Sequence, residues 1–179
     1  ELGDPLAVLA LEEDEPTPPG PLQVQVRTTA VGLTFPDVLS CRGEYQVPPK
    51  LPFTPGGETA GVVEAVGEGV DLEIGTAVAV LGGGLREINT VGAGSCFAYP
   101  TDALTAGQAA AVPVNYGTAW FALHDRAHIQ PGETILITGA AGGTGTACFP
   151  LALDAGAGAI AVVGGRPDEV ADPLKAEHR

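Results

Sequence analysis

The chain has 179 residues, of which 45% are hydrophobic and 17% are charged, a composition typical of a folded globular protein. Its formal net charge of −14 disfavours binding to nucleic acid or to an anionic membrane surface. No apolar run reaches the roughly 18 residues of a membrane span, so we expect neither a span nor a signal peptide. The three cysteines, Cys41, Cys96 and Cys148, are widely spaced, which predicts ordinary thiols in a reducing, cytoplasmic compartment.

The first part of the chain alternates short apolar segments with turns rich in glycine and proline. Strands are predicted at residues 6–11, 22–28, 58–66 and 75–80, and a short helix at residues 35–43 that ends at Gly43. The acidic, proline-rich residues 12–21 are predicted to form an exposed connection. Many short strands joined by such turns indicate a small β-barrel or sandwich.

The second part of the chain has a different pattern. Helices are predicted at residues 105–111 and 116–127, and buried strands at residues 133–138 and 159–163. A glycine cluster and a further helix lie between the two strands, which makes a βαβ unit. We therefore expect two domains, residues 1–103 and residues 104–179.

The glycine cluster, Gly139-Ala-Ala-Gly-Gly-Thr-Gly145, directly follows the first of these strands and opens the helix. A dinucleotide pyrophosphate needs backbone N–H donors at close range and gains from the positive end of a helix dipole. Residues with small side chains permit that approach. The candidate cofactor-binding residues here are Ala141, Gly142, Gly143, Thr144 and Gly145. The alternative is a glycine-rich turn in an unrelated α/β protein.

The end of the second strand bears on which cofactor would bind. NAD sites place an acidic residue there to hold the ribose 2′-hydroxyl. This chain reads Val162-Val-Gly-Gly-Arg166, which contains no acid. Gly164 and Arg166 are the candidate cofactor-binding residues here, and Arg166 would meet a 2′-phosphate, which favours NADPH over NADH. The alternative is an exposed loop arginine.

An ordered series of segments resembles the quinone oxidoreductases related to zeta-crystallin, in the medium-chain dehydrogenase/reductase superfamily. The series consists of Val31–Leu39, Arg42–Tyr45, Pro52–Val63, Val66–Val70, Val114–Trp120, Gln130–Glu133 and the glycine cluster. The resemblance implies an α/β protein with a β-rich part, namely a GroES-like β-barrel domain followed by a Rossmann domain. It also implies hydride transfer from NADPH to a small-molecule quinone, or to another activated double bond such as that of an enone.

The resemblance also predicts that no zinc is bound. Zinc-dependent relatives carry Cys-His where this chain has Thr34-Phe35, and a histidine where it has Gly57. Thr34 and Gly57 supply neither a thiolate nor an imidazole. His124 and His128 would share one helix face, and a solvated or capping pair is favoured there over a metal site.

Individual roles follow from the same resemblance. Tyr45 matches a tyrosine on the cofactor and substrate side, whose hydroxyl would orient a carbonyl or relay a proton; the alternative is a packed turn residue. Thr34, where many relatives have asparagine, is the second candidate catalytic residue. Thr118 matches a position near the nicotinamide, with a helix N-terminal residue as its alternative, and Asp37 is expected to cap or pair locally. Reduction of a quinone requires no strong general base, because the cofactor carries the chemistry.

The chain also departs from the family pattern. Family members are nearly twice as long, so we expect an incomplete Rossmann domain, truncated at its C-terminal side. The late strands through which family dimers pair are missing, although a homodimer is possible by resemblance. Pro150 lies inside the helix expected after the glycine cluster and is predicted to kink or break it. The alternatives to a quinone reductase are an enoyl-thioester reductase, or an inactive fragment that remains only a nucleotide-binding remnant.

Overall fold

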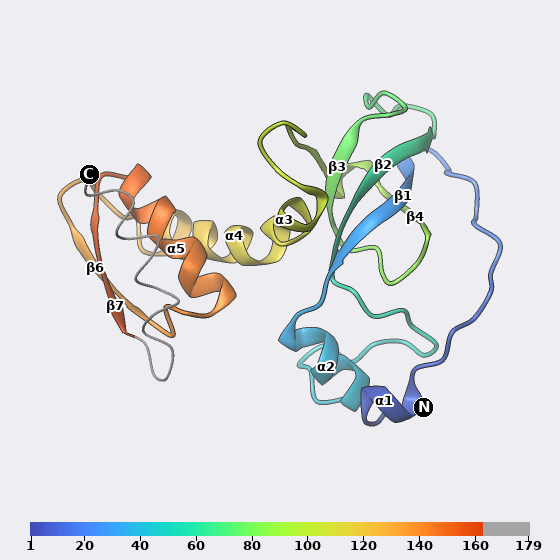
Figure 1. Ribbon diagram of the computed structural model, residues 1–179, viewed down its shortest axis with the longest axis horizontal. Helices are drawn as coiled ribbons and strands as arrows, with labels where there is room; N and C mark the ends of the chain where they lie inside the picture. The colour runs from blue at the N-terminus through green and yellow to red at the C-terminus, as the bar shows by residue number, and fades with distance from the viewer. Residues whose placement is uncertain (163–179) are drawn as a thin grey trace. The chain divides into compact units, whose positions relative to one another are not determined.

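The computed structural model describes residues 1–162. The chain forms two compact units, Glu1–Pro113 and a second unit that starts at Val114 (Figure 1). The division into domains at residues 103 and 104 stays a prediction. Within residues 1–162, no helix is both long enough and apolar enough to cross a membrane.

The first unit is built on a five-stranded antiparallel sheet with strand order β4-β1-β2-β3-β5. Its strands are β1 (Gln23–Gly32), β2 (Glu58–Val66), β3 (Ala77–Leu81), β4 (Ile88–Gly92) and β5 (Cys96–Ala98). The strands predicted at residues 22–28, 58–66 and 75–80 are confirmed. The buried valines of β1, β2 and β3 form the core, because alternate residues of each strand point to the same side. They are Val24, Val26, Val63, Val78 and Val80.

The strand predicted at residues 6–11 is wrong. The chain forms a short helix there, α1 (Pro5–Val8), and no strand within residues 1–162 pairs with it. Asp4 caps this helix by accepting a hydrogen bond from the Leu6 amide at 2.9 Å, and Pro5 supplies the fixed φ that suits a first helical position. The leucines of this segment do not reach the core, since Leu6 and Leu11 are fully exposed.

Besides α1, the first unit contains the helices α2 and α3, and a further helix, α4, leads into the second unit. The helix predicted at residues 35–43 is confirmed as α2 (Phe35–Arg42), which ends at Gly43 in the left-handed conformation with φ 73°. A short 3₁₀ turn, η1, spans Ala93–Ser95. Helix α3 (Ala106–Ala110) packs its buried Ala109 and Ala110 against the sheet, and α4 (Val112–Trp120) begins directly after it.

The second unit contains the predicted βαβ arrangement. Strands β6 (Thr134–Thr138) and β7 (Gly158–Val162) pair in parallel, with Thr134 opposite Gly158 and Thr138 opposite Val162. Helix α5 (Gly143–Asp154) connects them and lies along the two strands (Figure 1). The opposite face of the sheet is apolar and exposed, with Leu136 at 65% and Ile160 at 54% exposure.

Pro150 was predicted to kink or break the helix. The break is wrong, because α5 runs without interruption from Gly143 to Asp154, and the kink stays a prediction. Pro150 and Thr146, whose carbonyl loses its helical donor, both lie on the exposed face of α5. Water can therefore hydrate that carbonyl. The opposite face supplies Ala147, Phe149 and Ala152 to the core of this unit.

The prediction that His124 and His128 share one helix face is wrong. Helix α4 continues into a π-helix, η2 (Phe121–Arg126), whose turn holds more residues than an α-helical turn. His128 lies beyond its end with φ 52°, and the His124 ring packs against Trp120 with ring centroids 3.9 Å apart. The spacing of four residues therefore does not bring the two imidazoles to one face.

Candidate functional site

The glycine loop turns the chain from β6 into α5. Gly139 adopts φ 66°, a left-handed conformation that favours glycine, and the Gly142 amide donates a hydrogen bond to the Gly139 carbonyl at 2.9 Å. Gly142 is the N-cap of α5 and has an extended backbone, with φ −82° and ψ 166°. The first-turn amides of a helix have no partner within the helix, so Gly143, Thr144 and Gly145 present donors at its positive end.

Gly145 permits the close approach of α5 to the loop. A Cβ atom at this position would lie 2.7 Å from the Cα atom of Ala140, a distance that no real side chain tolerates. The Thr146 hydroxyl reinforces the contact by donating to the Ala140 carbonyl at 3.3 Å. The structure thus gathers the predicted residues from Ala141 to Gly145 around one helix start, while Gly164 and Arg166 lie outside the described residues.

The substrate-side candidates lie in the first unit. Thr34 is the N-cap of α2, and both its amide and its hydroxyl donate to Oδ2 of Asp37, at 2.7 and 2.8 Å. The other carboxylate oxygen of Asp37 accepts from the amides of Gly56 at 2.9 Å and Gly57 at 3.1 Å. Asp37 therefore caps locally, as predicted, and it also joins the two positions at which zinc-dependent relatives carry ligands.

The remaining predicted residues are placed more simply. Tyr45 follows the end of α2 in a bend and is half-buried. Thr118 lies within α4 of the second unit and is exposed, so the alternative of a helix N-terminal residue is wrong. Among residues 1–162, no group of three or more His, Cys, Asp and Glu side chains is placed to hold a metal ion. The absence of zinc stays a prediction.

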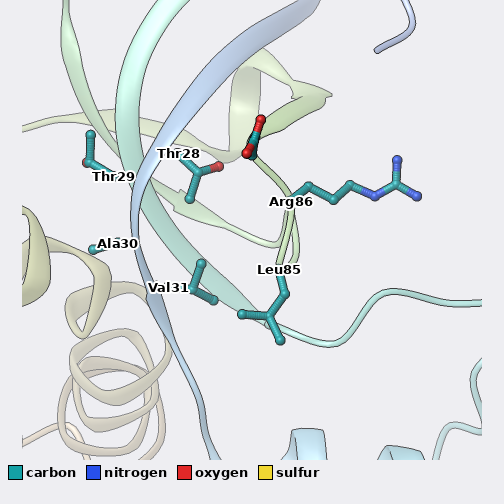
Figure 2. Close-up of a pocket in the computed structure, with 7 residues that line it drawn as sticks. Thr28, Thr29, Ala30, Val31, Leu85 and Arg86 are labelled. Atoms are coloured by element: carbon teal, nitrogen blue, oxygen red, sulfur yellow. The ribbon is translucent and has the colours of Figure 1, made fainter. Parts of the chain in front are cut away.

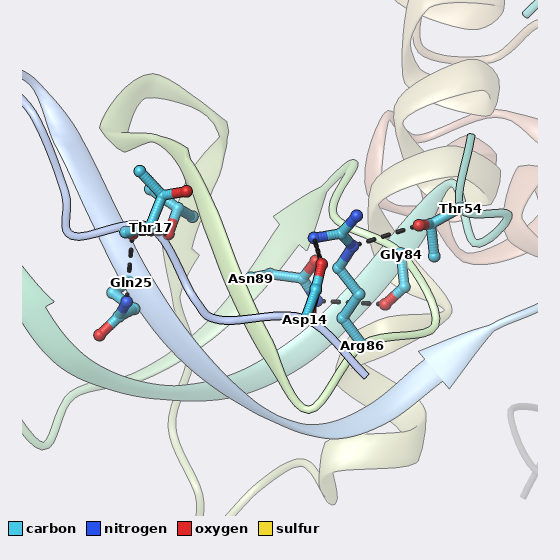
Figure 3. A network of polar contacts seen from close by, with 8 residues as sticks. Asp14, Thr17, Gln25, Thr54, Gly84, Arg86 and Asn89 are labelled. Atoms are coloured by element: carbon cyan, nitrogen blue, oxygen red, sulfur yellow. Dashed lines mark hydrogen bonds and ion pairs between the residues drawn. The ribbon is translucent and has the colours of Figure 1, made fainter. Parts of the chain in front are cut away.

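A second set of polar contacts, which the sequence did not indicate, holds the loop before β2. Arg86 donates to Asp14 at 2.6 Å and to the Thr54 hydroxyl at 3.1 Å (Figure 3). The buried side-chain amide of Asn89 donates to Thr28 and to the Gly84 carbonyl, which fixes the chain that carries Arg86. Residues 54–57 are thus held by Arg86 on one side and by Asp37 on the other.

Beside these contacts lies an open pocket of about 380 Å³ (Figure 2). Figure 2 shows Val31 and Leu85 directed toward each other, with the Arg86 guanidinium directed away from them. The pocket is lined by Thr28, Thr29, Ala30, Val31, Leu85, Arg86 and Glu87. None of the predicted site residues lines it. Sequence reasoning also did not single out Glu58, the residue that follows Gly57 in the chain. Its side chain is buried and packs against Gly32.

Comparisons with known proteins decide the family. Residues 20–103 match the alcohol dehydrogenase GroES-like domain. Quinone oxidoreductase-like protein 2 of Mus musculus is 41% identical over 165 residues, which cover 85% of this chain and 43% of the relative. The quinone oxidoreductase of Escherichia coli, solved as a complex with NADPH, superimposes with a TM-score of 0.83 at 32% identity, covering 98% of this chain and 54% of that one. The chain belongs to the quinone oxidoreductase family of the medium-chain dehydrogenase/reductase superfamily.

Other members of the superfamily are similar over the same stretch. The synaptic vesicle membrane protein VAT-1 homolog of Homo sapiens is 46% identical over 139 residues, covering 76% of this chain and 35% of the relative. The CurK enoyl reductase superimposes with a TM-score of 0.83 at 32% identity, over 92% of this chain and 52% of that one. This quinone oxidoreductase family member therefore spans about half the length of the relatives it matches. The expected fold, a GroES-like domain followed by part of a Rossmann domain, is confirmed.

The cysteines of this family member are expected to react slowly with thiol reagents. Burial raises the pKa of the Cys41, Cys96 and Cys148 thiols above the ordinary value, and the Asp37 charge adds to the increase at Cys41. A raised pKa leaves less thiolate at a given pH, so reaction with a disulfide reagent at neutral pH should be on the order of tenfold slower than for glutathione. Unfolding in urea should remove the difference. One rapidly reacting thiol in the folded protein would contradict this expectation.

Proposed function

We propose that the chain is part of an NADPH-dependent oxidoreductase that transfers a hydride to a quinone or to another activated double bond. The observation that carries the proposal is the loop from Gly139 to Gly145, where a left-handed glycine and a closely packed helix start leave backbone donors facing outward. The complexes of NADPH with quinone oxidoreductases of Escherichia coli and Thermus thermophilus support it. The chain is similar to both over more than nine-tenths of its length.

The residues of the second unit would hold the cofactor. Backbone amides at the start of α5 would donate to the pyrophosphate, and the helix dipole would add a favourable interaction with its charge. Thr118, exposed on α4, would contribute on the nicotinamide side, and Arg166 would select a 2′-phosphate. NADPH supplies a hydride when bound, and the acceptor completes its reduction with a proton from solvent.

The residues of the first unit would serve the acceptor. The Tyr45 hydroxyl would orient a carbonyl oxygen by donating a hydrogen bond, and Thr34 would lie on the same substrate side. Asp37 accepts from both the amide and the hydroxyl of Thr34, so it fixes the rotamer of that side chain. Such a division of roles requires no general base, because an electron-poor acceptor takes the hydride directly. Metal ions are not part of the proposed site.

An enoyl reductase is the second candidate. The CurK and JamJ enoyl reductases superimpose with TM-scores of 0.83 and 0.79 at 32% and 30% identity, so the fold does not separate the two activities. The acceptor separates them. A quinone should be reduced at least about tenfold faster than a crotonyl thioester if binding of the quinone is the specific interaction.

The test uses the whole chain, with NADPH and NADH offered separately. NADPH at about a hundred times its dissociation constant should stabilise the protein by about 2.7 kcal/mol, and NADH at the same concentration should stabilise it less. Oxidation of NADPH should then depend on added quinone. Stabilisation without turnover would indicate a nucleotide-binding remnant. A chain that neither binds NADPH nor unfolds cooperatively is an inactive fragment, which would overturn the proposal.

A further inference from the structure

Three glycines of the loop between β6 and α5 are required for three different reasons. Gly139 has a left-handed φ, and Gly145 approaches the backbone of Ala140. Gly143 has neither property, because it begins α5 with an ordinary helical backbone. A Cβ atom at Gly143 would instead lie 2.8 Å from Cγ and 3.0 Å from Nδ2 of Asn115. The side chain that excludes a larger residue here thus comes from another helix.

Asn115 reaches Gly143 from α4, and it is itself only partly exposed. Further along, the helical segment that follows α4 packs against α5 through Leu123 and Ala152, which share one apolar cluster. The two helical segments are therefore in contact at two separated points. The apolar cluster holds the later turns of α5, and the carboxamide of Asn115 lies against its first turn.

We propose that Asn115 is a positioning residue of the cofactor site: its carboxamide, seated on Gly143, fixes where the first turn of α5 presents its amides to a phosphate. The inference rests on the proposed binding of NADPH. Anion binding at a helix start depends on donors held at close range, so a displacement of this turn weakens binding without unfolding the helix. The contact between Asn115 and Gly143 also places the carboxamide near the proposed position of the negatively charged pyrophosphate. A charge introduced at residue 115 would therefore act on the bound phosphates.

The first experiment is a double-mutant cycle on the whole chain, with the dissociation constant of NADPH measured below the unfolding temperature of every variant. Asn115→Ala should weaken binding about threefold and Gly143→Ala at least about tenfold. The double variant should bind at least about threefold tighter than Gly143→Ala alone, because the added methyl group then occupies the vacated space. Gly107→Ala is the matched control, since an added Cβ atom there would meet no other part of the chain within 4 Å, and it should bind as the unaltered chain does.

The second experiment separates positioning from mere packing. Asn115→Asp keeps the shape of the side chain but places a negative charge at the start of α5. The helix dipole should leave the unfolding midpoint unchanged or raised. Repulsion of the phosphates should weaken NADPH binding at least about tenfold, with recovery at high salt. If the side chain at position 115 lay far from the bound phosphates, Asn115→Asp would leave NADPH binding unchanged.

The outcomes are distinguishable. If the unaltered chain does not bind NADPH, the proposed function fails and this inference fails with it. If the unaltered chain binds NADPH, and Asn115→Ala and Asn115→Asp both bind it as tightly as the unaltered chain does, the inference alone is overturned. The same conclusion holds if the effects of Asn115→Ala and Gly143→Ala simply add in the double variant, since independent residues give additive changes.

Discussion

Gly145→Ala should destabilise the second unit by about 3 kcal/mol and abolish NADPH binding. The new Cβ atom would meet the Cα atom of Ala140 at 2.7 Å and the carbonyl carbon of Gly139 at 3.0 Å. Both are backbone atoms, so no side-chain rotation relieves the contact. Helix α5 must move away from the loop, and the movement separates the Thr146 hydroxyl from the Ala140 carbonyl that it now contacts at 3.3 Å.

Fluorescence of Trp120, the one tryptophan of the chain, reports on this change because it lies in α4 of the second unit. The thermal unfolding midpoint of the second unit should fall by about 12 to 24 °C in Gly145→Ala. The control is Gly117→Ala in α4, where an added Cβ atom would meet no other part of the chain within 4 Å. This change should stabilise the helix by up to about 1 kcal/mol. Equal midpoints for the two variants would show that α5 does not pack on the loop as described.

Asp37→Ala should destabilise the first unit by about 3 kcal/mol. Four donors lose their acceptor at once, namely the amides of Thr34, Gly56 and Gly57 and the Thr34 hydroxyl. Hydrogen bonds to a charged group contribute about 1.5 to 3 kcal/mol each in favourable cases, and water compensates part of the loss at a half-buried site. The proposed quinone reductase activity should fall as well, because Thr34 loses the partner that fixes its rotamer.

The measurement is unfolding followed by far-ultraviolet circular dichroism, with Trp120 fluorescence recorded in parallel. The transition of the β-rich first unit should shift in Asp37→Ala, whereas the transition reported by Trp120 should stay in place. Asp14→Ala is the matched control, since this carboxylate pairs with the exposed Arg86 and such a surface pair should contribute no more than about 1 kcal/mol. A loss as small in Asp37→Ala as in Asp14→Ala would contradict the bridging role.

Local patterns allowed the sequence to predict much of this fold. The run Thr134-Ile-Leu-Ile-Thr138 followed by glycines has the signature of a strand that turns into a helix, and the loop forms within a few residues of it. The helix at residues 35–43 was predictable because Gly43 ends it. In each case the residues that define the structure lie next to one another in the chain.

Contacts between distant segments could not be predicted in the same way. Asp37 binds Gly57 across 20 residues, and Arg86 binds Asp14 across 72. Residues 6–11 are apolar enough for a strand, but none of the strands in the described part of the chain pairs with them, and the cap supplied by Asp4 favours a helix instead. Pro150 was expected to kink or break α5. It does not break the helix, because its exposed position lets water hydrate the carbonyl that loses a donor. These outcomes depend on tertiary surroundings rather than on residue type.

The apolar clusters of residues 1–162 fall into two sets with no residue in common. One set holds the valines of the five-stranded sheet and the alanines of α3, and the other surrounds α5. Separate cores make separate cooperative units, each of which opens with its own free energy. Within residues 1–162, the unit that contains α5 has a two-stranded sheet with one exposed apolar face, so we expect this unit to have the lower free energy of unfolding.

Ligand linkage then acts unequally on the chain. A nucleotide held at the start of α5 adds its binding free energy to the opening of the unit that contains α5. Amide protons of β6 and α5 would be protected from exchange with solvent by bound NADPH, while those of β1 and β2 depend on their own ladder. Cofactor concentration would therefore control the lifetime of the unit that contains α5.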